Sequence, residues 1–105
     1  MSQPYRWRME SYWVYILASK KDGAIYVGIT SDLLGRVWQH RQGTYGGHTK
    51  KYHIRRLVWF DEFPNPEDAI AFEKKLKRWR RAWKDELIAK ENPEWVDLYD
   101  QLTKP

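Results

Sequence analysis

The sequence predicts an α+β domain with a small three-stranded, mostly antiparallel sheet flanked by helices, in the order ββαβα(α)α. Two runs rich in β-branched and aromatic residues, YWVYILAS and AIYVGIT, lie on either side of the turn sequence KKDG. A third such run follows, with several segments that carry apolar residues every three or four positions. The 105 residues suffice for one domain, which we place at residues 11–103, after a basic tail of residues 1–10 that is expected to be flexible.

The first two runs are expected to pair as a β-hairpin over residues 12–30. Asp22-Gly23 between them is a strong turn signal, because glycine supplies the positive φ that a tight turn requires. Each run alternates as a half-buried strand does. This arrangement places Tyr15 and Tyr26 near the middle of the hairpin.

A helix is expected to follow over residues 32–41, with Thr30 or Ser31 as its N-cap. Gly35 inside it costs about 1 kcal/mol relative to alanine, which indicates that the backbone packs closely there. The apolar residues spaced for one face of this helix are Leu33, Leu34, Val37 and Trp38.

The middle of the chain is predicted to form a glycine-rich basic loop over residues 42–53 and the third strand over residues 55–63. Asn65, Pro66 and two acidic residues then form a helix start, because proline and negative charge both suit a helix N-terminus. The stripe that follows predicts one long helix, or two helices broken near residues 79–81. Its core residues are Ala69, Phe72, Leu76, Trp79, Trp83 and Leu87.

Pro93 ends this helical region. The run Asn92-Pro93-Glu94 is interpreted as a second helix start with Asn92 as its N-cap, and a capping role by itself is one of two interpretations of Asn92 that remain open. It begins a short last helix whose apolar side is made of Trp95, Leu98, Tyr99 and Leu102.

The composition excludes several classes of protein. With 42% hydrophobic and 16% aromatic residues, the chain is expected to pack a globular core. There is no apolar run of the roughly 20 residues that a membrane helix needs, and no apolar leader, so we expect a cytoplasmic protein. The absence of cysteine excludes disulfides, thiolate zinc sites and a cysteine nucleophile, and three histidines are too few for a convincing transition-metal site.

The charge distribution points to a polyanionic partner. The net charge is +5, and residues 74–84 hold seven basic residues and no acid, whereas residues 85–105 hold six acids and two bases. A second basic cluster lies in and after the glycine-rich segment. The side chains predicted to contact nucleic acid are Lys50, Lys51, Tyr52, Arg55, Lys75, Arg78 and Arg81.

One set of residues resembles the signature of the GIY-YIG nuclease family. Trp13-Val14-Tyr15 and Tyr26-Val27-Gly28 lie in the hairpin, with ten residues between the two tyrosines. Further along the chain come Arg36 and, four residues later, His40, then Glu73 early in the long helix and Asn92 before the last one. The resemblance covers residues 12–102 and is that of a small, single-domain member. Its first motif has tryptophan and valine where the family name has glycine and isoleucine, but both tyrosines are kept.

The resemblance implies an endonuclease that hydrolyses DNA phosphodiester bonds with one Mg²⁺ (or Mn²⁺) ion held by Glu73. Arg36 would offer a permanent positive charge to phosphate oxygens. Tyr26 or His40 would take the proton from water, and the sequence leaves this choice open, since a free tyrosine titrates near ~10 and a free histidine near ~6.5. The residues implied to converge at the catalytic site are Tyr15, Tyr26, Arg36, His40, Glu73 and Asn92.

Simpler interpretations exist for the same residues. The tyrosines are also ordinary strand residues, Arg36 and His40 suit a solvated helix flank, and Glu73 with Lys77 suits an i,i+4 pair worth only about 0.3 to 0.5 kcal/mol. Two alternative functions follow. One is a nucleic-acid-binding module on the same fold with weak, lost or partner-dependent activity. The other is a helper domain that docks to a protein complex through its basic and acidic helices.

A small domain has limited means of reading base sequence, because phosphate contacts position a protein without specifying a sequence. We therefore expect weak sequence preference, or preference for single-stranded or branched DNA, with RNA as a possible substrate and a protein partner as a possible source of specificity. The sequence carries no signal for the oligomeric state.

Overall fold

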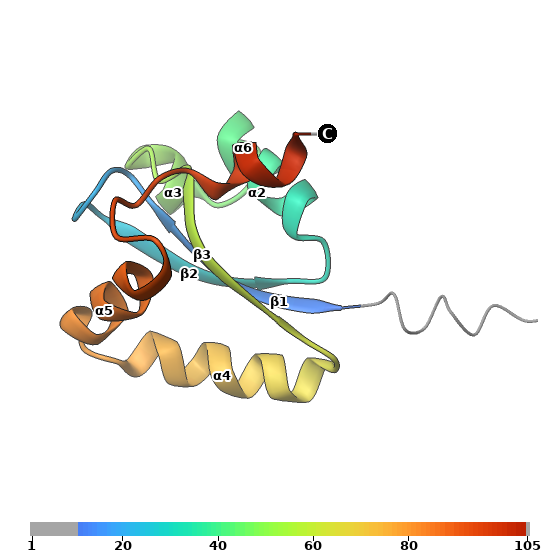
Figure 1. Ribbon diagram of the computed structural model, residues 1–105. Helices are drawn as coiled ribbons and strands as arrows, with labels where there is room; N and C mark the ends of the chain where they lie inside the picture. Colours follow the sequence, from blue (N-terminus) through green and yellow to red (C-terminus); the bar gives the residue numbers. More distant parts are fainter. Residues whose placement is uncertain (1–10, 105) are drawn as a thin grey trace, which may run out of the picture.

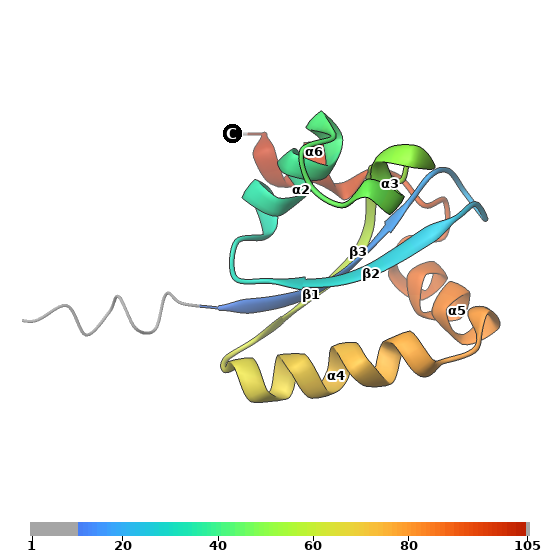
Figure 2. The ribbon, with the colours of Figure 1, turned by 180° about the vertical axis from the view of Figure 1, so that it is seen from behind.

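The computed structural model describes residues 11–104, and within them it contains one antiparallel sheet with helices on both faces (Figures 1 and 2). The elements, in chain order, are β1 (Tyr12–Ala18), β2 (Ile25–Thr30), α2 (Leu33–Gln42), α3 (Gly47–Lys51), β3 (Arg56–Phe63), α4 (Pro66–Arg78), α5 (Arg81–Glu91) and α6 (Leu98–Thr103). The strand order is β2-β1-β3, and both pairings are antiparallel. The predicted α+β class is confirmed. The predicted tail of residues 1–10 lies outside the described residues.

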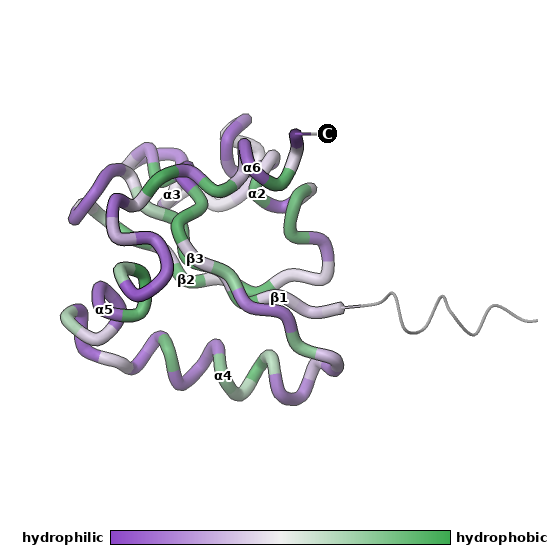
Figure 3. Tube along the Cα trace, viewed as in Figure 1, coloured by the Kyte–Doolittle hydropathy of each residue, from purple (hydrophilic) through white to green (hydrophobic). Residues whose placement is uncertain are grey.

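The central strand β1 is buried on both faces. Residues 14–18 are all fully buried, so the half-buried alternation expected for this strand is wrong. The reason is that α4 and α5 cover one face of the sheet while α2 and α6 cover the other (Figure 1). Figure 3 shows hydrophobic residues concentrated along the strands, while hydrophobic and hydrophilic residues alternate along α4.

The hairpin turn follows the prediction in place but not in backbone conformation. Asp22, and not Gly23, has the positive φ, at 60°. Aspartate tolerates this region better than most residues do. Glycine suits position 23 for a different reason. A Cβ there would overlap the Ser19 hydroxyl, which accepts a hydrogen bond from the Ala24 N–H at 3.0 Å.

The N-cap of helix α2 lies after both residues that were predicted for this role, Thr30 and Ser31. Asp32 is the N-cap, and its carboxylate accepts a hydrogen bond from the Gly35 backbone N–H at 3.1 Å. Thr30 supports this cap by accepting from the Asp32 N–H at 3.0 Å. The close approach predicted at Gly35 is thus made with this cap, because a Cβ on Gly35 would overlap the Asp32 carboxylate.

The buried face of α2 also differs from the predicted stripe. Leu33 and Val37 are buried, but Leu34 and Trp38 are 39% and 52% exposed. His40 takes the third buried position, four and then three residues along the same face. The helix is therefore rotated so that a polar residue reaches the sheet.

The glycine-rich segment contains the short helix α3, which the prediction of a loop missed. Gly46, at φ 75°, precedes it, and Thr49 is fully buried at its centre. A five-residue helix has too few positions for a visible period, and its anchoring comes from Thr49.

Of the two alternatives for the long helical region, the structure has two helices. Trp79 ends α4 in an extended conformation with ψ 146°, and the chain turns before α5 begins. The turn breaks the helical periodicity, so Trp83 is 49% exposed and the prediction that it lies in the core is wrong.

The last helix begins later than predicted. Asn92 is the C-cap of α5 and not the N-cap of a new helix, and Asp97 caps α6 by accepting from the Tyr99 N–H at 3.1 Å. Trp95 lies in the connection with φ 55° and is almost fully buried. No helix of residues 11–104 is long and apolar enough to cross a membrane.

Candidate active site

Tyr15 and His40 form a buried polar pair between the sheet and α2. The Tyr15 hydroxyl lies 3.0 Å from Nε2 of His40, and Nδ1 of His40 lies 2.9 Å from the Thr49 hydroxyl. The Thr49 hydroxyl donates its only hydrogen to backbone carbonyls at 3.0 and 3.1 Å, so it must accept from Nδ1–H of His40. Nε2 is then the unprotonated nitrogen, and it accepts from Tyr15. These hydrogen bonds select the tautomer of His40 that is protonated on Nδ1.

Burial sets the protonation states of this pair. Burial, together with the nearby Arg36 charge, lowers the pKa of His40 to about 4. Burial raises the pKa of Tyr15, and the neighbouring Tyr26 adds to this effect while Arg36 opposes it. At neutral pH, His40 is therefore an uncharged acceptor and Tyr15 a protonated donor.

Gly28 makes room for the Tyr15 ring. The two residues are partners across β1 and β2, and a Cβ on Gly28 would overlap the ring, with its Cε2 atom at 2.9 Å. The ring therefore lies against bare backbone of β2, where Tyr26 and His40 also lie, with ring centroids 6.3 and 5.9 Å from that of Tyr15. Sequence reasoning assigned Gly28 no role, although its place opposite Tyr15 in the hairpin is readable.

Arg36 is held at the exposed side of this cluster by Tyr45. The guanidinium carbon of Arg36 lies 3.9 Å from the centre of the Tyr45 ring, and its Nε donates to Gln39 at 3.2 Å. The Tyr45 ring in turn meets His40 edge-on at 5.0 Å. The sequence analysis did not predict a role for Tyr45. This residue lies in the connection between α2 and α3, where no hydrophobic periodicity indicates which side chains pack inward. A cation over an aromatic face is stabilised by the ring electrons, so the Arg36 charge has a defined position.

Glu73 and Lys77 form an ion pair on α4, with 2.6 Å between carboxylate oxygen and Nζ. The i,i+4 pair predicted from the spacing is confirmed. The residue Glu73 is only 9% exposed, while the Lys77 side chain is 52% exposed. Lys77 has a raised pKa because Glu73 accepts a hydrogen bond from it.

The Tyr26 phenol is influenced both by the Arg36 charge and by the Glu73–Lys77 ion pair. It is half-buried on the edge strand β2, and burial raises its pKa most. Tyr45 and Glu73 also raise the pKa of Tyr26, whereas Lys77 and Arg36 lower it. The Tyr26 phenol is thus within electrostatic reach of Arg36 on α2 and of the Glu73 pair on α4. The structure therefore gathers five of the six predicted catalytic side chains around β2.

A divalent ion of the magnesium type fits this donor set. Among residues 11–104, no three histidine, aspartate or glutamate side chains gather as a metal cluster. Within the predicted catalytic set, Glu73 is the one carboxylate that could hold such an ion. Mg²⁺ commonly binds in this way, with one or two carboxylates and with waters and substrate phosphates in the remaining positions. The Glu73 carboxylate is buried beside a cation that an incoming metal ion would displace.

Comparison with known proteins shows the family of this chain. Residues 11–86 match the family model described as the GIY-YIG catalytic domain. The chain belongs to the GIY-YIG family. This is a nuclease-type family whose members typically use divalent metal ions, and the resemblance inferred from the paired tyrosines is confirmed.

Relatives of this GIY-YIG protein include two bacterial proteins whose names state no activity. It is 34% identical over 79 residues to the UPF0213 protein BH0048 of Halalkalibacterium halodurans, covering 75% of this chain and 83% of the relative. It is 33% identical over 87 residues to a UPF0213 protein of Cupriavidus pinatubonensis, covering 82% and 97%. The solution NMR structure of the UPF0213 protein BH0048 from Bacillus halodurans superposes with a TM-score of 0.53 at 29% identity, covering 90% of this chain and 99% of that one.

Asn92 does not join the other GIY-YIG signature residues. Its side-chain amide donates to the carbonyls of Val58 and Val96 at 3.1 and 2.9 Å, and its oxygen accepts from the Val96 N–H at 3.0 Å. Val58 belongs to β3, at the opposite edge of the sheet from β2. The amide is fully used in holding the connection after α5 against β3, so the expectation that it converges with the catalytic set is wrong.

The side chains predicted to contact nucleic acid divide into two groups. Arg81 is engaged within the protein, since it pairs with Asp85 at 2.7 Å and donates to the Gly23 carbonyl. The others are exposed and make no ion pair with any described residue: Lys50, Lys51, Tyr52, Arg55, Lys75 and Arg78. These six side chains of the GIY-YIG domain remain predicted contacts.

Proposed function

We propose that this protein is an endonuclease that hydrolyses DNA phosphodiester bonds with the help of one Mg²⁺ or Mn²⁺ ion. The observation that carries the proposal is the position of Tyr26. The electrostatic influence of Arg36 from one face of the sheet and of the Glu73–Lys77 pair from the other meets at this phenol. Phosphodiester hydrolysis needs an activated water and positive charge on the phosphoryl oxygens. Tyr26 would take the proton from the water once a bound divalent ion adds positive charge, and Arg36 and the ion would supply the charge for the phosphoryl oxygens.

Of the two candidates for the general base, we assign the role to Tyr26. Both ring nitrogens of His40 are used in hydrogen bonds, and the side chain is fully buried. Tyr26 is only half-buried, on the edge strand β2, and no hydrogen bond of its hydroxyl to another described residue is found. Its raised pKa makes it a poor base in the protein alone, and added positive charge beside it, like that of Arg36 and Lys77, lowers the pKa. Tyr15 and His40 then act as positioning residues.

Glu73 would hold the ion, which when bound supplies positive charge for the phosphate and for the leaving oxygen. Arg36 would bind the phosphoryl oxygens through its fixed guanidinium. The exposed cations on α3 and α4 would contact the phosphates of the strand. Such contacts carry little sequence information, which supports weak sequence preference or a preference for single-stranded or branched DNA.

A second candidate is a nucleic-acid-binding module on this fold whose cleavage is weak or depends on a partner. One observation favours it: Lys77 already occupies the Glu73 carboxylate at 2.6 Å. A carboxylate neutralised by a lysine is a weaker ligand for a divalent ion, because the ion must first displace the lysine.

The test is a cleavage assay on labelled single-stranded, duplex and branched DNA with Mg²⁺, Mn²⁺ or EDTA. Wild type is compared with Glu73→Gln and Tyr26→Phe, and with Glu67→Gln as a matched control, since Glu67 is an exposed acid in the first turn of the same helix. We expect metal-dependent cleavage that the first two variants lose by at least a hundredfold and the control keeps. Cleavage by Glu73→Gln at the wild-type rate would contradict the proposal, and binding without cleavage would favour the second candidate.

A further inference from the structure

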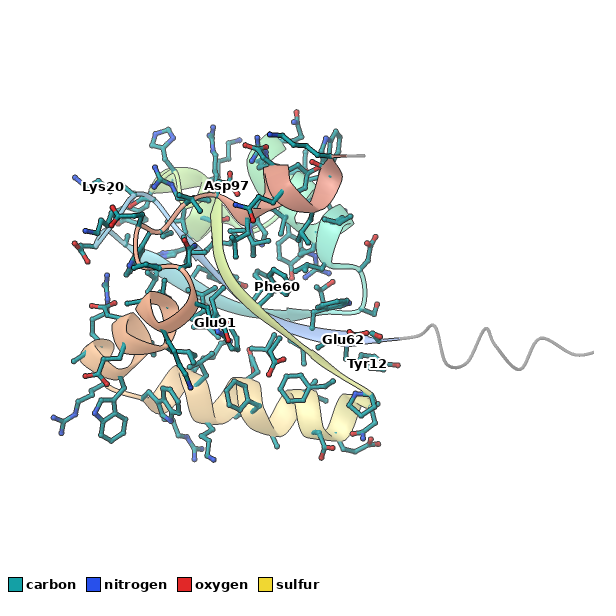
Figure 4. All side chains as sticks on the ribbon, in the orientation of Figure 1. Tyr12, Lys20, Phe60, Glu62, Glu91 and Asp97 are labelled. Atoms are coloured by element: carbon teal, nitrogen blue, oxygen red, sulfur yellow. The ribbon has the colours of Figure 1, made fainter. Side chains whose placement is uncertain are left out.

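A basic recess lies beside the C-terminal end of α2. It is a cavity of about 440 Å³ between the end of β1, the end of α2, the start of β3 and the chain that enters α6. Its walls include Ser19, Arg41, His53, Arg55, Arg56 and Asp97. Figure 4 labels Asp97 at this edge of the molecule, above β3. None of these side chains belongs to the proposed catalytic set.

The recess carries more positive than negative charge. Arg41 is paired with Asp97 at 2.7 Å, which neutralises one arginine. Neither Arg55 nor Arg56 has a carboxylate within 4 Å among the described residues. Two uncompensated guanidinium groups in one concave site favour an anion, because field lines concentrate in a cleft with low-dielectric walls.

Two of the arginines are fixed before any ligand arrives. The Arg41 guanidinium also lies over the Tyr99 ring, 4.6 Å from its centre. Arg56 donates through one nitrogen to the Trp95 carbonyl at 2.9 Å and keeps its remaining N–H donors. Preorganised donors lose little conformational entropy when they bind, which suits the forked recognition of phosphate oxygens.

A purely structural interpretation explains part of this arrangement. Asp97 caps α6 and accepts from the Leu57 N–H at 3.1 Å, so its pair with Arg41 has a role in the fold. That role does not involve Arg55, which is exposed and makes no hydrogen bond or ion pair with a described residue. It also leaves most of the Arg56 donors unused.

We propose that this recess binds a phosphate group. The ligand chemistry is a phosphate mono- or diester, and its source is either a nucleic-acid strand that also reaches the active site or a free nucleotide. The first source rests on the proposed function. Arg36 and Arg41 lie on the same helix with about 7.5 Å of axial rise and about 140° of rotation between them, so a strand that meets both would pass around α2. The second source does not depend on nuclease activity.

The test uses the full chain in EDTA, so that no cleavage occurs. Amide resonances are followed by NMR during titration with inorganic phosphate, with thymidine monophosphate and with a twelve-nucleotide single strand. We expect each phosphate-bearing probe that enters the recess to move the resonances of Ser19, His53 and Arg56 together. Unmoved resonances with all three probes would overturn the proposal.

Variants then separate binding from folding. Arg55→Gln removes an exposed side chain that makes no hydrogen bond or ion pair with a described residue, and Arg55→Gln/Arg56→Gln removes both uncompensated charges. Lys90→Gln, an exposed position on α5, is the matched control. We expect at least tenfold weaker binding in the double variant, an intermediate loss in Arg55→Gln and no change in the control. An unchanged affinity in both recess variants would refute the site, whatever the double variant does to stability.

The outcomes also identify the source and separate this proposal from the nuclease. If the oligonucleotide uses the recess, the salt dependence of its affinity becomes shallower in the variants, by about 0.7 in log–log slope for each phosphate that is no longer neutralised. If only thymidine monophosphate and inorganic phosphate bind there, the site belongs to a free nucleotide. Recess binding by a protein that never cleaves DNA would support this site and refute the proposed function. Cleavage of DNA by a protein whose recess binds none of the three probes would support the proposed function and refute this site.

Discussion

The Tyr15 hydroxyl donates to Nε2 of His40 across 3.0 Å, and both side chains are fully buried. The Thr49 hydroxyl orients the opposite side of the imidazole, so the histidine has one tautomer and one charge state at neutral pH. A histidine in such a position acts through its neighbours, because neither nitrogen is left to meet a substrate.

His40 should therefore not titrate in the physiological range. We expect its pKa to be about 4, with Nδ1 carrying the proton above that pH, because burial and the Arg36 charge both disfavour the imidazolium ion. Two-dimensional NMR of the imidazole nitrogens between pH 3.5 and 8 measures both properties. A midpoint near 6.5 would show that the histidine is exposed to solvent.

The same shift predicts how stability depends on pH. The unfolded chain binds a proton at His40 below its ordinary pKa of about 6.5, whereas the folded protein resists protonation down to about 4. Stability must then fall as the pH is lowered from about 6.5 to about 4. Thermal unfolding at a series of pH values should show this loss in the wild type and a smaller one in His40→Gln. Equal slopes in the two proteins would assign the loss to carboxylates instead.

Gly28→Ala should disturb the cluster through Tyr15. The added methyl group overlaps the Tyr15 ring, and overpacking of this kind costs roughly 1–3 kcal/mol of unfolding free energy. Gly47→Ala is the matched control, because a Cβ at Gly47 has no neighbour within 4 Å. Chemical denaturation of both variants gives the comparison. A Gly28→Ala protein as stable as Gly47→Ala would mean that the ring moves aside at no cost.

Lys77→Met should strengthen binding of the divalent ion if Glu73 is its ligand. Removal of the lysine leaves the carboxylate without its 2.6 Å partner, so an incoming ion no longer has to displace it. Calorimetric titration with Mn²⁺ should give a tighter affinity than wild type. Lys74→Met should leave the affinity unchanged, because Lys74 is exposed on the same helix and forms no ion pair with another residue of the range 11–104. Weaker binding in Lys77→Met would show that the lysine supports the site.

Asn92→Ala should affect stability and not chemistry. The substitution removes three hydrogen bonds to Val58 and Val96. It leaves the buried Val58 carbonyl without its Asn92 partner, at a cost of roughly 1–3 kcal/mol. Cleavage per folded molecule should equal that of wild type below the unfolding transition. A variant that is stable but inactive would place the amide in the reaction after all.

The strands and the two-helix alternative could be predicted from the sequence because they depend on local signals, and the family could be predicted because its signature residues keep their order and spacing along the chain. Strand propensity, the Asp22-Gly23 turn and the Asn65-Pro66 start are each contained in a few neighbouring residues. The rotation of α2 about its own axis could not be predicted from the sequence. Trp38 is more apolar than His40, and only the buried partners Tyr15 and Thr49 make the histidine the better core residue.

The errors at the last helix cap and at Tyr45 have the same cause, which is that the deciding contacts are distant in the sequence. Asn92 and Asp97 both have side chains that cap helices well, and the choice between them depends on Val58 and on Leu57, which lie more than thirty residues earlier in the chain. Tyr45 was missed for a similar reason. Its value to the site comes from Arg36 on a different element, and no spacing rule connects a helix position to a loop aromatic.

The placement of β1 at the centre of the sheet separates the two tyrosines of the motif in their dynamics. Tyr15 belongs to a strand whose amides are bonded on both sides and covered on both faces, whereas Tyr26 belongs to an edge strand. Hydrogen exchange at the first should require opening of the whole molecule, and at the second only fraying of one edge. The Tyr15 phenol is thus expected in the most protected part of the protein, and the proposed reactive phenol of Tyr26 on an edge where local opening admits solvent.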